Sequence, residues 1–240
     1  GWWNPVYVPL LLTSMAVNYG IGSRLSAGHQ SGGRLLLLLG ICFNLGLLGY
    51  FKYFNFFVDS INAAVGSDFN FEKIILPLAI SFYTFQQITY LVDSRRRLTE
   101  SHSWLDYSLF VTFFPQLIAG PIVHHGEMLA QFNRLGSRTA VLRNLTIGIS
   151  ILAIGLFKKV VLADNLALLA DPVYALSASG EALYSPDILA GVLASSLQLY
   201  CDFSGYSDMA IGLAAMFGIR LPVNFLSPYR STNIIEFWRR

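Results

Sequence analysis

Residues 188–217 of this chain read ILAGVLASSLQLYCDFSGYSDMAIGLAAMF, a run that is apolar enough to lie in a bilayer yet carries Asp202 and Asp208. An ionisable side chain at membrane depth costs about 2.5 to 3.5 kcal/mol on insertion scales for Asp, and it is usually kept for a pathway, a site or a structural pairing. We therefore predict that the segment from Tyr200 to Arg240 contributes to the functional site.

Composition places the whole chain among membrane proteins. Of its 240 residues, 54% are hydrophobic and 12% are charged, and the mean hydropathy is +0.53. Soluble domains carry about 25% charged residues, and a helix needs roughly 20 apolar residues to cross a bilayer, a length that several runs here approach or reach. The sequence therefore predicts an all-α fold, a polytopic transmembrane helical bundle with broken or re-entrant helices.

The charges between the apolar runs predict the topology, because loops rich in Lys and Arg stay on the cytoplasmic side. Loops 22–34 and 95–97 are basic, whereas loops 59–73 and 171–187 are mainly acidic and are expected outside. Helices are expected over residues 6–21, 35–58, 74–92, 144–170 and 188–217. In the second of these, Gly40, Gly46 and Gly49 favour close helix packing.

Residues 105–123 are nearly long enough to cross a membrane, yet both of their flanks are basic. Pro115, Gly120 and Pro121 interrupt the run. Broken backbone is tolerated at membrane depth only where protein buries it or where it lines a cavity. We expect a re-entrant segment that lines a cavity with Gln116 and Pro121, and an ordinary kinked span is the alternative.

Two further helices carry unusual polar residues. Residues 74–92 contain many hydroxyl and amide side chains, including Gln86, so this helix is expected to face protein or water rather than lipid. Residues 144–170 contain Lys158 and Lys159, which lie on different faces of an ideal helix. We favour a shorter span preceded by an interfacial helix over one uninterrupted span.

Common catalytic and metal-binding motifs are absent from the sequence, which has no Gly-x-Ser-x-Gly, Cys-x-x-Cys or His-Glu-x-x-His. Of the four histidines, His124 and His125 are adjacent, and they are expected to be solvated loop residues rather than ligands, so no metal site is predicted. No block of Lys and Arg with interleaved aromatic residues is present, and nucleic-acid binding is not expected.

Several sequence words carry a resemblance to a known family. They are GPIVHHGE at 120–127, DFSGYSDMAIGLA at 202–214 and NIIEFWRR at 233–240, supported by GWWNPVYVPLLL at 1–12, LGLLGYFKYFNFFVDSIN at 45–62 and LPLAISFYTFQQITYLVD at 76–93. The chain resembles the membrane-bound O-acyltransferase family, in the bacterial branch of alginate O-acetylation and teichoic-acid D-alanyl transfer proteins. The resemblance covers essentially the whole chain, in the right order.

This resemblance implies an enzyme that moves an acetyl or similar acyl group to hydroxyls of an extracytoplasmic polysaccharide. The donor would be a cytoplasmic thioester, acetyl-CoA or a carrier-protein thioester, used as a substrate, with no bound cofactor. The protein would cross the bacterial cytoplasmic (inner) membrane several times, in contact with membrane lipid, and would work with soluble or membrane acyl-transfer partner proteins.

In the family, the catalytic histidines follow the FWRR word. The resemblance therefore implies that no catalytic residue lies within the chain. It also implies that residues 1–240 form a single but incomplete domain, without the family's N-terminal helix and C-terminal catalytic half. Residues 1–240 alone are then expected to be inactive.

The residues expected to line or support the site are Asp202, Ser204, Tyr206, Asp208, Trp238, Arg239, Arg240, Gln116, Pro121 and Gln86. Asp202 and Asp208 are expected to orient a catalytic imidazole or to pair with Arg239 or Arg240, or else to cap broken helices or bond nearby hydroxyls. Ser204 and Tyr206 line the chamber or join helices by hydrogen bonds. Trp238, Arg239 and Arg240 position a histidine or anchor the chain at the membrane interface.

A second hypothesis is a non-catalytic polytopic transporter or polysaccharide-export partner whose broken helices line a substrate path. The two hypotheses share the membrane-embedded fold and differ in whether a proton-accepting histidine serves the site. A sugar hydroxyl is a poor nucleophile, and a neutral imidazole within hydrogen-bond reach can take its proton as it attacks a thioester.

Overall fold

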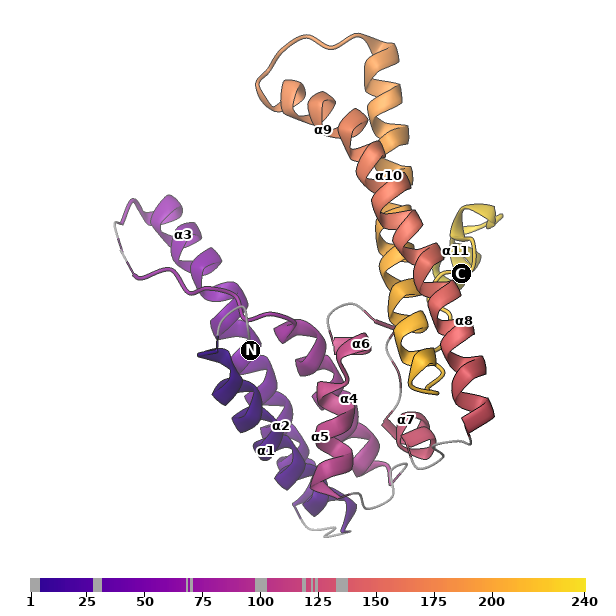
Figure 1. Ribbon diagram of the computed structural model, residues 1–240. Helices are drawn as coiled ribbons and strands as arrows, with labels where there is room; N and C mark the ends of the chain where they lie inside the picture. The colour runs from indigo at the N-terminus through magenta and orange to yellow at the C-terminus, as the bar shows by residue number, and fades with distance from the viewer. Residues whose placement is uncertain are drawn as a thin grey trace. The chain divides into compact units, whose positions relative to one another are not determined.

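The computed structural model describes residues 5–27, 32–67, 69, 71–97, 103–117, 120, 121, 123, 125–132 and 138–240. Within these residues every regular element is a helix (Figure 1), which confirms the all-α prediction. The chain divides into two compact units. Unit 1 comprises residues 1–118 and 124–130, and unit 2 comprises residues 119–123 and 131–240. The prediction of a single domain stays a prediction.

Unit 1 is built on three helices that pack together, α1 (Tyr7–Ser26), α2 (Gly33–Leu48) and α4 (Ile80–Arg95). A π-helical turn, η1 (Gly49–Tyr53), joins α2 to α3 (Phe54–Val65), and α5 (Trp104–Thr112), α6 (Phe114–Leu117) and α7 (His125–Phe132) follow. The helix predicted to end at Val58 thus continues to Val65, and it stops at Gly66, which has a positive φ of 69°.

Two asparagine side chains hold the chain that returns from α3 in an extended form. Asn62 Nδ2 donates to the Phe69 carbonyl at 2.9 Å, and Asn62 Oδ1 accepts from the Phe69 N–H at 3.0 Å. Asn55 repeats this double bond with Ile74 at 2.8 and 3.1 Å. Because these backbone groups are already paired and Pro77 follows, α4 begins at Ile80, and the prediction of a helix from residue 74 was wrong at that end.

The polar residues of α4 are used partly inside unit 1. Gln87 Oε1 accepts hydrogen bonds from Ser14 Oγ at 2.7 Å and from Asn18 Nδ2 at 2.8 Å. Asn18 and Asn44 bond each other at 2.6 and 3.2 Å, and all four side chains are buried. This helix face contacts protein rather than lipid, as its polarity predicted.

The interruption predicted within residues 105–123 is present. Helix α5 opens with a capping box between Ser103 and Asp106 and ends before Phe113, whose backbone is extended (φ −62°, ψ 97°). The short α6 follows, with Pro115 in its first turn. Whether the broken segment is re-entrant or a kinked span is a matter of membrane topology and stays a prediction.

Unit 2 contains α8 (Arg138–Leu156), the π-helical η2 (Phe157–Ala163), α9 (Asp164–Ala178), α10 (Ser185–Met216), the 3-10 turn η3 (Pro228–Arg230) and α11 (Ile234–Arg239). Helices α8 and α10 lie side by side (Figure 1). Residues 138–178 form one continuous helical stretch without a break, and which part of it spans the membrane and which part is interfacial stays a prediction. The predicted loop 171–187 is also shorter, because α9 runs through Pro172 to Ala178.

Glycines bring α8 and α10 close together. A Cβ added at Gly155 would lie 2.6 Å from the carbonyl oxygen of Gly205, and one at Gly212 would lie 2.7 Å from that of Gly148. Such contacts with backbone atoms leave no room for a side chain, the small-residue packing common between membrane helices. Gly40 of α2 packs against Leu91, whereas a Cβ added at Gly46 of α2 or at Gly49 of η1 would meet nothing within 4 Å, contrary to expectation.

Among the residues that the structure describes, two helical stretches are long and apolar enough to cross a membrane, Gly33–Val65 with a mean hydropathy of 1.8 and Ala140–Ala178 with 2.0. Only 11% of each window is buried, whereas the core helix of a soluble protein is mostly buried. Their exposed surfaces are therefore suited to contact with lipid. Further spans stay a prediction.

Candidate functional site

The segment from Tyr200 to Arg240 folds back on itself within unit 2. The rings of Tyr200 and Tyr229 lie 5.4 Å apart, and those of Phe203 and Phe225 lie 5.1 Å apart. Tyr229 Oη donates a hydrogen bond to the Ser196 carbonyl at 2.9 Å. These contacts hold the chain after α10 against one face of that helix.

Asp202 and Asp208 of α10 pair with the lysines of η2. Lys158 Nζ lies 2.6 Å from Asp208 Oδ2, and Lys159 Nζ lies 2.8 Å from Asp202 Oδ1 and 2.8 Å from Asp164 Oδ1. Pairing with Arg239 or Arg240, which the sequence suggested, was therefore wrong. The tight glycine packing of α8 on α10 sets η2 beside the aspartates, and its long lysine side chains reach them.

Both adjacent lysines reach α10, although neighbours on an ideal α-helix point to different faces. The turn that contains both lysines, η2, is π-helical. This geometry adds a residue to the helical turn and is frequent at functional sites. The apolar pattern around these lysines predicted an interfacial position for them and not their pairing with aspartates. The sequence does carry a signal for this pairing, because one apolar run contains two lysines and another contains two aspartates, and charges at membrane depth tend to pair.

Ser204 and Ser207 are buried in α10, each with only 1% of its surface exposed. Within the described residues, neither Oγ has a hydrogen-bond partner. Ser204 precedes Asp208 by four residues and so lies on the same helix face. A buried hydroxyl without a partner calls for a water or ligand group to bond it, which agrees with the prediction that Ser204 lines a chamber. Tyr206 is half-buried.

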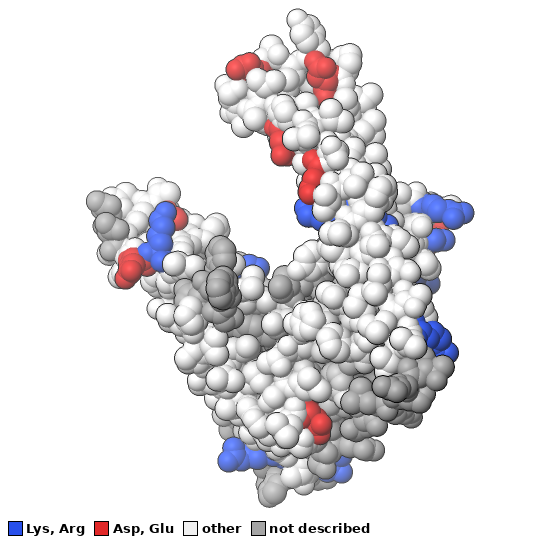
Figure 2. Space-filling model, in the orientation of Figure 1, with Lys and Arg blue, Asp and Glu red and all other residues white. Residues whose placement is uncertain are grey.

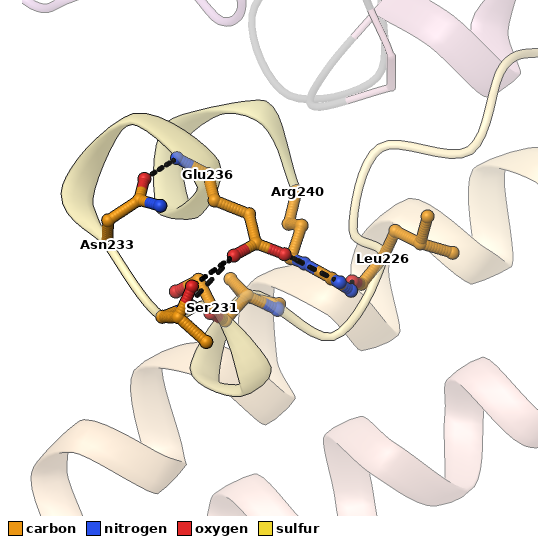
Figure 3. Close-up of polar contacts among 7 residues, drawn as sticks. Leu226, Ser231, Asn233, Glu236 and Arg240 are labelled. Atoms are coloured by element: carbon orange, nitrogen blue, oxygen red, sulfur yellow. Dashed lines mark hydrogen bonds and ion pairs between the residues drawn. The ribbon is translucent and has the colours of Figure 1, made fainter.

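A second polar cluster lies at the C-terminal end of the Tyr200–Arg240 segment (Figure 3). Glu236 Oε1 accepts from Arg240 Nε at 2.8 Å and lies 2.8 Å from Arg240 Nη2, while Glu236 Oε2 accepts from the N–H and hydroxyl of Thr232, both at 3.0 Å. Asn233 Oδ1 caps the Glu236 N–H at 2.8 Å. Arg240 Nη1 donates to the Leu226 carbonyl at 3.2 Å, and the Leu226 N–H donates to the Arg240 carbonyl at 2.6 Å.

Glu236 is therefore a structural residue that the sequence analysis missed. The Asn-x-x-Glu spacing of a helix start was the signal for it. The pKa of Glu236 is lowered below its ordinary value of 4.5, first by the hydrogen bond from the Thr232 backbone and then by Arg240. This carboxylate fixes Arg240 to the loop that carries Leu226.

Trp238 and Arg239 lie on the outside of α11. Trp238 is 80% exposed, and Ile234 and Ile235 beside it are 66% and 68% exposed. An exposed tryptophan next to arginine suits a membrane interface. The same residues also fit the role of positioning a catalytic histidine. Both roles stay predictions.

Gln86 and Gln116 lie in unit 1 and Pro121 lies in unit 2, and all three are buried. Within the described residues, Gln86 Oε1 and both amide atoms of Gln116 have no hydrogen-bond partner. A buried carboxamide in this state fits a cavity lining, because it needs water or a ligand to satisfy it. That these residues share one chamber with α10 stays a prediction.

The histidines fall outside this description. His29, His102 and His124 lie outside the described residues, as does the side chain of His125. The prediction that His124 and His125 bind no metal therefore also lies outside them. Among the side chains that the structure does describe, no group of three His, Cys, Asp or Glu is placed to hold a metal ion.

Comparison with known proteins extends this picture. A sequence model of the membrane-bound O-acyltransferase family matches residues 79–240. The chain is 44% identical to a peptidoglycan O-acetyltransferase of Helicobacter pylori over 265 aligned residues, which cover 99% of this chain and 50% of that protein. It is 42% identical to a probable alginate O-acetylase of Pseudomonas aeruginosa, over 100% of this chain and 46% of that protein.

A more distant similarity, 28% identity, links it to a teichoic acid D-alanyltransferase of Bacillus subtilis, over 70% of this chain and 42% of that protein. The chain thus spans about half the length of the curated relatives that it matches.

Proposed function

The chain belongs to the membrane-bound O-acyltransferase family, and on that premise we propose that it serves the transfer of an acetyl or similar acyl group to hydroxyls of an extracytoplasmic polysaccharide. The observation that carries this proposal is the identity of 42% to 44%, over nearly the whole chain, to proteins named for O-acetylation of alginate and peptidoglycan. Both names specify acetyl and a glycan, which favours acetyl over alanyl here.

The donor in this proposal is a cytoplasmic thioester, used as a substrate. The sugar hydroxyl attacks the thioester carbonyl, the new C–O bond forms as the C–S bond breaks, and the released thiol takes up a proton. A histidine base would accept the hydroxyl proton. The chain's own contribution is the polar stripe of α10, where Lys158 and Lys159 hold the carboxylates of Asp208 and Asp202 in place.

This function needs a protein that crosses the bacterial cytoplasmic membrane, because donor and acceptor lie on opposite sides. The two long apolar helices support membrane embedding. We further propose that the protein crosses the membrane several times and works with soluble or membrane acyl-transfer partners.

The test is a transfer assay in sealed inside-out membrane vesicles from cells that express the gene encoding this chain. Radiolabelled acetyl-CoA or acetylated carrier protein, supplied to the cytoplasmic face, should label polysaccharide inside the vesicles in a hydroxylamine-sensitive ester. A protein that exports unmodified glycan without labelling it would support the transporter hypothesis instead.

Residues 1–240 expressed by themselves should transfer no acyl group, because the family resemblance places the catalytic histidines after the FWRR word. The same vesicle assay checks this, with the product of the whole gene as the positive control. Donor-dependent acetylation by residues 1–240 alone would show that a base within them is sufficient.

A further inference from the structure

A cluster of charged side chains lies on one face of unit 2, and it includes Asp164, which is 2.8 Å from Lys159. Lys158 and Lys159 stand near the middle of the apolar stretch Ala140–Ala178, paired with Asp208 and Asp202 of α10. The lysine side chains are 29% and 36% exposed, and those of Asp208 and Asp202 are 24% and 42% exposed. In Figure 2, acidic and basic atoms adjoin on this unit within a surface that is otherwise mostly uncharged.

These groups keep unused hydrogen-bonding capacity. An ammonium group has three donors and an ionised carboxylate accepts about four hydrogen bonds, whereas Lys158 and Asp208 share one bond with each other. Contact of such groups with lipid tails would leave the remaining donors and acceptors unsatisfied, and an exposed charge in hydrocarbon is costly. This face is therefore suited to water or a polar ligand rather than to lipid.

Two features beside the ion pairs support this conclusion. Cys201, Ser204 and Asp208 follow one another at three and then four residues, so they line one face of α10. The Ser204 hydroxyl on that face is buried and has no partner within the described residues. The adjoining η2 is π-helical, a distortion that is frequent at functional sites.

We propose that the face formed by Lys158, Lys159, Asp202 and Asp208, called here the ion-paired face, lines a water-filled cavity at membrane depth and binds hydroxyls of the glycan acceptor. Carboxylates accept from sugar hydroxyls, and ammonium groups and Ser204 donate to them. Because both lysines are already paired, the face fits neutral hydroxyls better than sugar carboxylates. The glycan part of this inference rests on the proposed function, whereas the hydration part does not.

Two native cysteines, Cys42 and Cys201, can report whether their surroundings are water or lipid. Cys201 lies next to Asp202 and is half-buried. Cys42 is exposed on α2 among exposed leucines, Leu38, Leu39 and Leu45. A thiol reacts as its thiolate, which forms in water and not in lipid. The two cysteines therefore report on the ion-paired face and on a lipid-facing surface.

The experiment treats the whole protein, in its native membrane, with the charged reagent methanethiosulfonate ethylammonium. Cys42→Ser and Cys201→Ser variants, each of which retains one cysteine of this segment, assign the label. We expect Cys201 to react at least about tenfold faster than Cys42, since it alone meets water. A neutral acceptor analogue, a chitin oligosaccharide, should slow the labelling of Cys201 and leave that of Cys42 unchanged.

Labelling of Cys201 no faster than that of Cys42 would overturn the water-filled cavity. Fast labelling of Cys201 that the chitin oligosaccharide does not slow would overturn the acceptor role. The labelling rate does not depend on catalysis, so rapid labelling of Cys201 in a protein without acyl transfer would refute the proposed function and leave the hydrated face intact.

Discussion

At the scale of residues, two ion pairs, Lys158–Asp208 and Lys159–Asp202, join η2 to α10. Asp202 and Asp208 stood out because acids are rare in a run that could lie in a bilayer. Their pairing with Lys159 and Lys158 depends on how α8 packs on α10, a tertiary fact that no local spacing encodes. Glu236 was missed for a different reason, because its hydrogen bonds to Thr232 and Arg240 belong to a turn that the apolar pattern does not reveal.

The Lys158–Asp208 pair can be tested by unfolding. Asp208→Asn leaves Lys158 without its charged partner and should lower the free energy of unfolding in detergent by about 1.5 to 3 kcal/mol, the range for hydrogen bonds to charged groups. Exchanging the two residues, Lys158→Asp with Asp208→Lys, should restore part of that loss.

The matched control is Glu181→Gln, which removes an exposed acid in the loop between α9 and α10 and should change stability by no more than about 0.5 kcal/mol. If Asp208→Asn and Glu181→Gln had equal free energies of unfolding, the ion pair would contribute no stability.

Glu236 predicts a pH dependence. Its pKa is lower in the folded chain than the ordinary 4.5, so the stability that it contributes is fully present above 4.5. That contribution is lost as the pH falls through the folded value, and α11 should then exchange its amide hydrogens faster. Hydrogen exchange of residues 234–240, compared at each pH with Glu236→Gln, measures this effect. If the variant showed the same pH dependence as the native chain, Glu236 would not be its source.

At the scale of elements, the sequence predicted which runs are helices better than where they begin and end. The extent of α10 agrees with the prediction to within a few residues, because its apolar run has clear limits. The start of α4 does not, because Asn55 and Asn62 hold the preceding backbone extended through bonds across a long loop. Helix α9 runs through Pro172 to Ala178, although the acidic residues of 171–187 had predicted a loop from residue 171.

Close packing of α8 and α10 gives a prediction at this scale. Gly155→Ala would place a Cβ 2.6 Å from the Gly205 carbonyl oxygen, and since backbone cannot move aside cheaply, the free energy of unfolding should fall by about 1 to 3 kcal/mol. Gly46→Ala meets nothing within 4 Å and should be neutral or slightly stabilising. Thermal unfolding in detergent measures the stability of both variants. Equal unfolding midpoints for the two would contradict the close contact between α8 and α10.

At the scale of the whole molecule, composition predicted a membrane protein and the sequence words predicted the family, which the match over residues 79–240 confirms. The all-helical fold follows from apolar runs too long for strands. Which walls enclose a chamber could not be predicted from residue patterns, since it depends on contacts between segments far apart in the chain. The expectation that Gln86, Gln116 and Pro121 line one chamber depends on such contacts and stays a prediction.

The proposed O-acetylation of a cell-surface glycan can be measured as the ester-linked acetyl content of that glycan. Purified glycan from cells with the intact gene, from cells in which it is deleted, and from complemented cells would be treated with mild alkali and the released acetate quantified. Acetate should be lost on deletion and restored on complementation. Equal acetate in all three, with the glycan still exported, would contradict the claim.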